Sequence, residues 1–223
     1  MNAIILSAIL GVVLMFSGIM FKNGNTVRNI AIAGMLILLF ANLAEMKGYH
    51  FFDINTKNLL SFTRFGLLFN SIAIGATLMY MLVSSRDIVN VGINVAEYFA
   101  LIFFVLCGIA LITAFQSLLM LFLGIEIVSI PLYILTGADK RNLKSNEAAL
   151  KYFLMGSFST GIMLMGIVLV YGAKATFNIE LMGADVNPGR NAWYLSGLLL
   201  LLISMAFKVS AAPFHFWTPD VYD

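Results

Sequence analysis

Residues 193–217 read WYLSGLLLLLISMAFKVSAAPFHFW, an apolar run that places Lys208, Pro213 and His215 before it ends. A transmembrane helix needs about 20 predominantly apolar residues, so this run is long enough to cross a bilayer. Inside a bilayer a charged side chain is costly, and a proline removes a backbone hydrogen bond from its helix. The run therefore predicts a membrane helix that is broken near Pro213, with a lysine in an unusually apolar place.

The rest of the sequence has the same character as this run. It is 61% hydrophobic and only 11% charged, whereas soluble globular proteins are about 45–50% apolar and about 25% charged. A chain so poor in charge cannot cover a surface that faces water, so we expect an all-α polytopic membrane protein. The formal net charge of +2 gives no reason to expect a nucleic-acid partner.

Seven runs satisfy the length and composition of a transmembrane helix, and they predict a single transmembrane domain over residues 1–223. The first is a membrane helix rather than a signal peptide, because it lacks a basic start and a cleavage site. The loop between the fifth and sixth runs contains several basic residues, and basic loops usually lie on the cytoplasmic side. With that loop inside, the N-terminus lies outside. The runs are residues 3–21, 30–46, 65–83, 98–114, 118–137, 148–172 and 193–217.

Two buried ionisable residues are the first candidates for function. Glu126 lies near the middle of the fifth run, and Lys208 lies deep in the seventh. Ionisable residues inside a membrane mark proton or ion pathways by default. Desolvation disfavours a charged ammonium and a nearby carboxylate favours it, so a Glu126–Lys208 pair suits groups that gain and lose a proton in turn. The alternative is a static buried ion pair that fixes the packing of the helices.

Three further residues of the seventh and sixth runs join this hypothesis. Pro213 frees a backbone carbonyl, and such breaks are tolerated where they line a hydrated cavity. His215 follows Lys208 by seven residues, which is one face of an unbroken helix. It is either a proton relay or an interfacial histidine. Lys151 lies at the start of the sixth run, where it either extends the path or reaches the interface by snorkelling.

Other features of the sequence predict a structural role or the absence of a binding site. Pro131 predicts a second helix break, close to Glu126. Glu45, at the end of the second run, is expected at the membrane interface. The sequence has one cysteine, Cys107, so no disulfide or cysteine-held iron–sulfur cluster is expected within it. No P-loop and no GxGxxG motif is present, so no nucleotide site is predicted. No metal site is predicted either.

Three motifs carry a resemblance to a known family. They are GIEIVSIPLYIL, EAALKYFLMGSFSTGIMLMGIVLVYG and FKVSAAPFHFWTPDVYD. They resemble the proton-channel core of subunit N of bacterial NADH-quinone oxidoreductase, respiratory complex I, most strongly over residues 110–223. The resemblance implies an antiporter-like fold of inverted repeats. Residues 1–96 would supply the first three helices and residues 97–223 the first part of a repeat. The chain would then be about the N-terminal half of such a subunit.

The resemblance also implies roles and partners. Glu126, Lys208, Lys151 and His215 match residues that transfer protons in the family, and no residue of this chain would be catalytic in the redox sense. The chain would be a multi-pass protein of the bacterial inner membrane, with other complex I membrane subunits and the lipid bilayer as partners. Quinone, NADH, FMN and iron–sulfur clusters would lie in those partner subunits. A subunit of an Mrp-type cation/proton antiporter and a purely structural membrane subunit are the alternatives.

Overall fold

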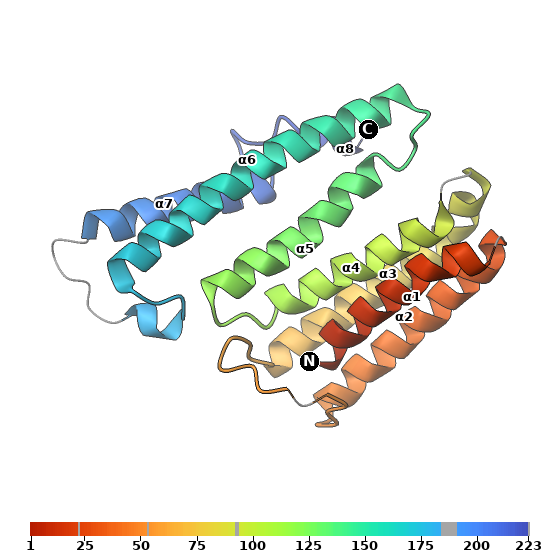
Figure 1. The fold of residues 1–223 in the computed structure, drawn as a ribbon, viewed down its shortest axis with the longest axis horizontal. Helices are drawn as coiled ribbons and strands as arrows, with labels where there is room; N and C mark the ends of the chain where they lie inside the picture. The colour runs from red at the N-terminus through yellow and green to blue at the C-terminus, as the bar shows by residue number, and fades with distance from the viewer. Residues whose placement is uncertain (22, 53, 92–93, 184–190, 223) are drawn as a thin grey trace. The chain divides into compact units, whose positions relative to one another are not determined.

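The structure, a computed structural model, describes residues 1–223 except 22, 53, 92–93, 184–190 and 223. Its described part is built from helices joined by loops (Figure 1). Six of these helices, α1 to α6, are long and apolar enough to cross a membrane, and α7 is a shorter apolar helix. The helices are α1 (Asn2–Met20), α2 (Gly24–Met46), α3 (Arg64–Val91), α4 (Val95–Ile112), α5 (Leu118–Thr136), α6 (Leu143–Lys174), a 3-10 helix (Glu180–Gly183), α7 (Asn191–Lys208) and α8 (Thr218–Tyr222).

The expected seven membrane runs all coincide with helices, but the seventh ends earlier than predicted. α7 ends at Lys208 and not near Pro213. Ser210 has a positive φ of 55°, and the Ala211 amide donates to the Ala206 carbonyl at 2.9 Å. A left-handed residue followed by such a bond is the Schellman arrangement that closes many helices. The break is therefore made before Pro213 is reached, and Pro213 follows it within the loop, after a cis peptide bond.

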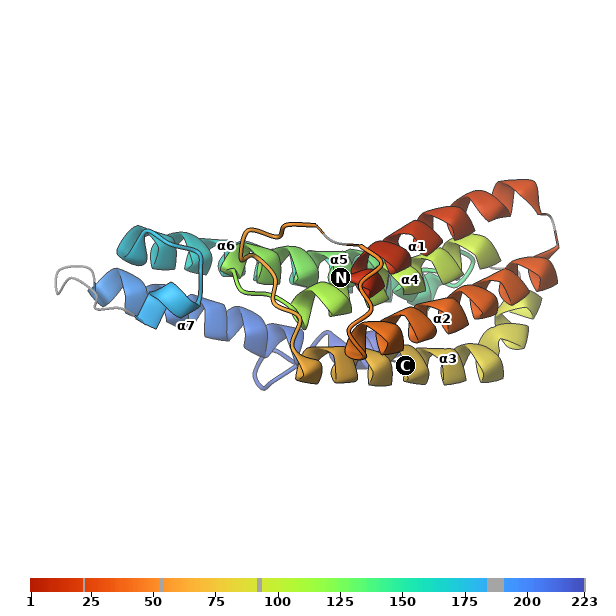
Figure 2. The same cartoon turned by 90° about the horizontal axis from the view of Figure 1, so that it is seen from below.

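Contacts between helices divide the chain into two compact units, Met1–Ala114 and Phe115–Asp223. The first unit includes α4, which packs against α1 and α2. In the first unit α1 to α4 lie alongside one another (Figure 2). Their buried faces include uncharged polar side chains that bond between helices. Asn42 of α2, for example, donates to Leu67 O and Ser71 Oγ of α3, at 2.9 and 2.8 Å.

Glu45, expected near the membrane interface, lies in the last turn of α2 and is buried inside this first unit. Only 3% of the residue is exposed. Its carboxylate accepts hydrogen bonds from the amine of Met1 and, at 2.9 Å, from the amide of Asn2. A buried carboxylate needs such partners because an unpaired charge is very costly to desolvate. The N-terminal end of α1 supplies them.

In the second unit, α6 and α7 form a close antiparallel pair. Gly166 of α6 faces Gly197 of α7, and a Cβ added at Gly166 would lie 2.9 Å from the Gly197 carbonyl oxygen. About two turns further along the pair, Ser204 Oγ donates to Ser159 O at 3.0 Å, with both side chains buried. Small residues let membrane helices approach closely, and hydroxyls bond across them. This packing fixes the end of α7 against the middle of α6.

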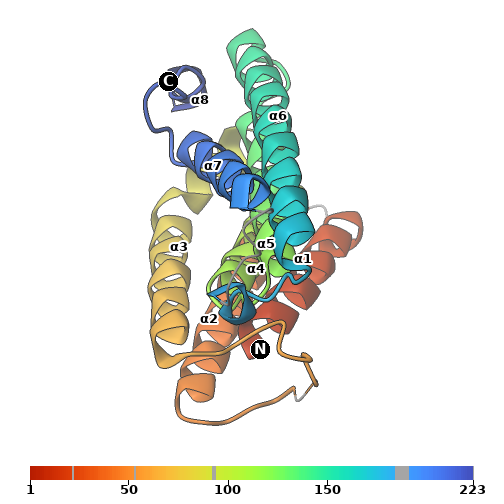
Figure 3. The ribbon, with the colours of Figure 1, turned by 90° about the vertical axis from the view of Figure 1, so that its left-hand side faces the viewer.

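The chain turns back after α7, and α8 lies beside the N-terminal half of α6 (Figure 3). The turn is closed by a 2.7 Å bond from Thr218 Oγ1 to Ser210 Oγ. α6 has 32 residues, about 48 Å of helix at about 1.5 Å per residue, whereas the hydrocarbon layer is about 30 Å thick. The first turns of α6 therefore extend beyond the apolar layer, and α8 packs against this polar end.

Candidate functional site

Lys208 is the last residue of α7, and its ammonium group points at three hydroxyl groups. Nζ lies 3.0 Å from Ser129 Oγ and 3.2 Å from Tyr133 OH, both on α5, and 3.5 Å from Thr160 Oγ1 on α6. An ammonium has three protons to donate, so these three oxygens can satisfy it completely. The lysine is held in a half-buried position by groups of two neighbouring helices, which explains how the end of an apolar helix accommodates it.

Glu126 reaches this cluster through Thr160. Thr160 Oγ1 donates to Glu126 Oε1 at 2.8 Å and is itself within reach of Lys208 Nζ. The ion pairs of the described residues do not include a direct contact between Glu126 and Lys208. The two predicted partners are instead linked through the Thr160 hydroxyl. We call Glu126, Thr160, Lys208, Ser129 and Tyr133 the lysine cluster.

The Thr160 hydroxyl has a choice between two acceptors. Its oxygen lies 2.8 Å from Glu126 Oε1 and 3.0 Å from the Gly156 carbonyl oxygen, but it has a single proton. An ionised Glu126 attracts that proton in a charge-assisted bond. A protonated Glu126 would donate to the Thr160 oxygen, and the hydroxyl would then donate to Gly156. Both protonation states of the carboxyl group are therefore satisfied without backbone movement.

Ser129 and Tyr133 complete the cluster in different ways. Ser129 Oγ donates to Ile125 O at 2.7 Å, so its oxygen is left to accept from Lys208. Tyr133 is packed against Gly156 of α6, where an added Cβ would overlap the phenol group. Glycine at position 156 therefore makes room for the phenol. The sequence analysis missed Ser129 and Tyr133, because a serine or a tyrosine in an apolar helix is usually a packing residue.

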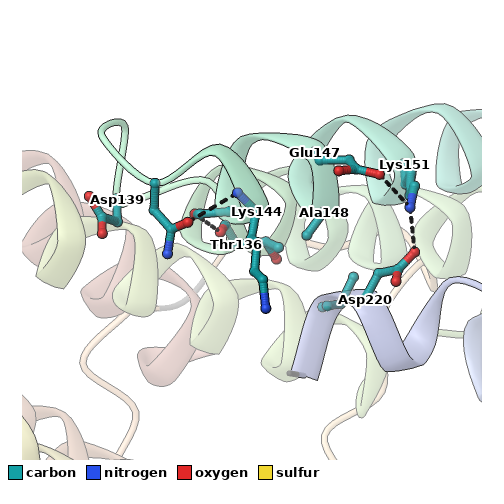
Figure 4. A pocket seen from close by; sticks show the side chains of 10 residues that line it. Thr136, Asp139, Lys144, Glu147, Ala148, Lys151 and Asp220 are labelled. Carbon is teal, nitrogen blue, oxygen red and sulfur yellow. Dashed lines mark hydrogen bonds and ion pairs between the residues drawn. The ribbon is translucent and has the colours of Figure 1, made fainter.

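Lys151 lies apart from the lysine cluster, in a polar cavity at the start of α6. α6 begins at Leu143, so Lys151 lies about two turns inside the helix, near the start of the apolar run that begins at residue 148. Its Nζ is 2.8 Å from both Glu147 Oε1 and Asp220 Oδ2, and about half of the side chain is exposed (Figure 4). The cavity has a volume of about 520 Å³. We call it the polar vestibule; its lining is Thr136, Asp139, Asn142, Lys144, Ser145, Glu147, Ala148, Lys151, Asp220 and Val221.

The remaining predicted residues are not brought to the cluster. α7 ends at Lys208, so the expected common helical face of Lys208 and His215 does not exist. His215 is exposed and stacks on Phe216, with ring centroids 4.9 Å apart. The break predicted at Pro131 is also absent, since α5 runs through this residue without interruption. In the described residues no group of three or more His, Cys, Asp or Glu side chains is arranged to hold a metal ion.

The segment that contains the lysine cluster matches a known family of membrane proteins. Residues 115–223 match the family model described as NADH:quinone oxidoreductase/Mrp antiporter, TM. That segment contains the whole lysine cluster and the polar vestibule. Over these residues, about half of its length, the chain is similar to this family of transmembrane subunits.

The curated relatives that this chain matches include subunits N of NADH-quinone oxidoreductase. The subunit N of Flavobacterium johnsoniae is 38% identical over 226 residues, which covers 100% of this chain and 48% of the relative. The subunit N of Cytophaga hutchinsonii is 38% identical over 223 residues, again with 100% of this chain and 47% of the relative. The chain thus spans about half the length of the curated relatives that it matches.

Solved structures agree on the fold. A chain of respiratory complex I from Thermus thermophilus superposes with a TM-score of 0.78 at 29% identity, over 99% of this chain and 47% of that one. A chain of the Mrp complex from Dietzia superposes with a TM-score of 0.71 at 17% identity, over 100% of this chain and 44% of that one. The second likeness concerns the fold alone. The multi-pass fold of this chain is therefore also found in chains of these two membrane complexes.

Proposed function

We propose that this chain forms part of a proton-translocating subunit of a bacterial NADH-quinone oxidoreductase, in the inner membrane. The lysine cluster is the proposed site of proton transfer. Glu126 and Lys208 are the groups that gain and lose protons, and Thr160 connects them. The observation that carries this proposal is the hydrogen-bond path from Lys208 Nζ through Thr160 Oγ1 to Glu126 Oε1.

The path suits proton transfer because its connecting groups are hydroxyls. A hydroxyl both donates and accepts, so the direction of each bond can reverse when a proton moves. Charged Lys208 donates to Ser129, Tyr133 and Thr160. After Lys208 loses a proton, its neutral amine can accept a hydrogen bond from Tyr133 or Thr160. Backbone carbonyls in the same places could not do this, because they have no proton to give.

Redox chemistry supplies the driving force in this proposal, and it takes place elsewhere. NADH, FMN, iron–sulfur clusters and quinone would be bound by other subunits, and this chain would perform no redox step itself. Its partners would be neighbouring membrane subunits and lipid. Lys151 and His215 would extend the path beyond the lysine cluster. Lys151 has the stronger support, because it lies in the polar vestibule on the same helix as Thr160.

The proposal is tested with Lys208 variants of the full-length subunit in the assembled complex. We expect Lys208→Ala to lose most proton translocation per NADH oxidised in proteoliposomes. Lys208→Arg should also be impaired, because arginine keeps the charge but does not deprotonate in proteins. A Lys208→Arg complex that pumps normally would support a static ion pair and the purely structural alternative. Normal pumping by both assembled variants would exclude the proposed role of Lys208.

An Mrp-type cation/proton antiporter is the second candidate, and one observation favours it. The matching family model is described by both NADH:quinone oxidoreductase and Mrp antiporter. Copurification separates the two candidates. The full-length protein should purify with NADH dehydrogenase activity if the first is right. Cation-driven proton exchange in vesicles, with no associated NADH oxidation, would instead establish the second.

A further inference from the structure

Four aromatic side chains connect the polar vestibule to the lysine cluster. Tyr152 follows the vestibule residue Lys151 directly, and Trp217 lies just before α8, which carries Asp220. The Tyr152 and Trp217 rings stack with centroids 4.5 Å apart and an angle of 7° between planes. Tyr152 also meets the edge of Tyr133, at 4.6 Å. Trp217 in turn stacks on Phe207 at 5.6 Å.

This aromatic group lies against both polar regions. Tyr133 contacts Lys208 Nζ through its hydroxyl, and Phe207 is the residue before Lys208. On the other side, Lys151 and Asp220 line the vestibule. The packed rings thus run from the residue after Lys151 to the hydroxyl that contacts Lys208. Apolar constrictions of this kind stop water and ions by remaining dry.

Among the four aromatic residues, Trp217 lies in the segment between the end of α7 and the start of α8. The residue is only 5% exposed, and its indole Nε1 has no hydrogen-bond partner among the described residues. A buried donor without a partner is costly, so the closed packing of Trp217 is not the most favourable state for its N–H group. A position in which water reaches this group would relieve that cost.

The segment that carries Trp217 is joined to α6 by a weak ion pair. Asp220 Oδ2 lies 2.8 Å from Lys151 Nζ, and their side chains are 45% and 46% exposed. Ion pairs between exposed groups contribute little to stability, so this contact can open readily. Glu147 competes for the same ammonium, also at 2.8 Å. Lys151 can therefore release Asp220 and still keep an acidic partner.

We propose that Trp217 is a gate between the vestibule and the lysine cluster, and that the Lys151–Asp220 ion pair keeps it closed. With the pair formed, α8 stays on α6 and Trp217 stays packed on Tyr152. Opening the pair frees the segment and lets water pass the rings toward Lys208. The inference rests on the proposed proton route, since it names the barrier in that route, but its test measures water access and not pumping.

The test uses a cysteine as a reporter behind the gate. Ser129→Cys places a thiol beside Lys208, at a residue that is 5% exposed. Cys107 and any cysteine elsewhere in the full-length subunit are replaced by serine. The assembled complex is treated with 2-aminoethyl methanethiosulfonate, which reacts with hydrated, ionised thiols. Mass spectrometry then gives the labelling rate of the reporter.

We expect Trp217→Ala to be labelled several times faster than the parent, because it removes the ring that fills the path. Trp217→Phe should stay close to the parent rate, since a ring remains. Asp220→Asn should raise the rate less than Trp217→Ala, and Asp220→Glu should restore it. Equal labelling of the parent and Trp217→Ala would overturn the gate. Equal labelling of Asp220→Asn and Asp220→Glu would overturn the role of the ion pair.

Two features keep the experiment decisive. Position 220 is half exposed, so Asp220→Asn and Asp220→Glu test the control of the gate even if Trp217→Ala does not assemble. Labelling rates also do not depend on proton translocation. Normal pumping by the Lys208 variants would reject the proposed function and leave the labelling result intact. Unchanged labelling together with impaired pumping would reject the gate alone.

Discussion

The two units bury carboxylates in different ways. In the first unit Glu45 is almost fully buried, and its partners are a backbone amide and the Met1 amine. In the second unit Glu126 is less buried, and its partner is the hydroxyl of Thr160. The Asn2 amide that binds the more deeply buried carboxylate cannot become an acceptor, whereas the Thr160 hydroxyl that binds the less buried one can reverse its role. The chemistry of the partner, and not the depth of burial, distinguishes a structural carboxylate from a candidate proton carrier.

The same contrast extends to neutral groups. Asn42 and Thr113 of the first unit bond to polar groups of neighbouring helices and link no ionisable residues. Thr160 of the second unit also bonds between helices, but it links Glu126 to Lys208. Side-chain bonds between membrane helices contribute about 0.6 kcal/mol on average in one well-studied protein. We therefore expect that removing such a hydrogen bond lowers stability by a similar amount in either unit. Only removal in the second unit should also lower proton translocation.

The largest difference is expected between Glu126→Gln and its matched control, Glu45→Gln. Glutamine at position 126 can still accept from Thr160 but cannot ionise, so proton translocation per NADH should fall severalfold. Glutamine at position 45 should lower the thermal stability of the complex and leave that ratio unchanged in the molecules that assemble. Proton uptake and NADH oxidation are measured together in proteoliposomes. A Glu45→Gln complex with the same loss of pumping would remove the distinction between the units.

A smaller effect is expected when Thr160 is replaced. Thr160→Val keeps the shape of the side chain but removes the hydroxyl between Glu126 and Lys208, so pumping should slow. Thr160→Ser should recover most of the rate because it restores the hydroxyl. Thr113→Val in the first unit is the control, since it removes a 3.0 Å bond to Asn70 without touching an ionisable group. Turnover that does not differ between Thr160→Val and Thr160→Ser would show that the hydroxyl is dispensable.

The smallest effect concerns packing of the cluster. A Cβ at position 156 would overlap the Tyr133 phenol, so Gly156→Ala should cost about 1–3 kcal/mol of stability, as overpacking does. Gly161→Ala on the same helix is the control, because nothing lies within 4 Å of its added Cβ. It should be neutral or slightly stabilising, since alanine favours helix more than glycine does. Thermal denaturation of the solubilised complex compares them, and equal midpoints would contradict the close packing of Tyr133.

The sequence predicted the membrane helices well because apolar runs of sufficient length have few alternatives to helix in a bilayer. It also singled out Glu126 and Lys208, because ionisable groups inside such runs are rare. It could not predict what lies between them. Thr160 is 34 residues from Glu126 along the chain, and only the packing of α5, α6 and α7 brings the three residues together.

Three other features of the structure could not be predicted from the sequence. The end of α7 depends on a left-handed serine, Ser210, and serine is not a usual signal for that conformation, which favours glycine. The burial of Glu45 depends on Met1, 44 residues away. The position of Lys151 depends on Asp220, which belongs to a short helix beyond the break. In the last two cases the partner is distant in sequence, so no spacing pattern could reveal it.

The central claim is that Glu126 changes its protonation state during turnover whereas Glu45 does not. Infrared difference spectroscopy of the assembled complex measures this directly, through the C=O band of a protonated carboxyl group that appears or disappears on reduction by NADH. The account predicts a band that is lost in Glu126→Gln and kept in Glu45→Gln. Identical difference spectra for the wild-type and Glu126→Gln complexes would contradict it.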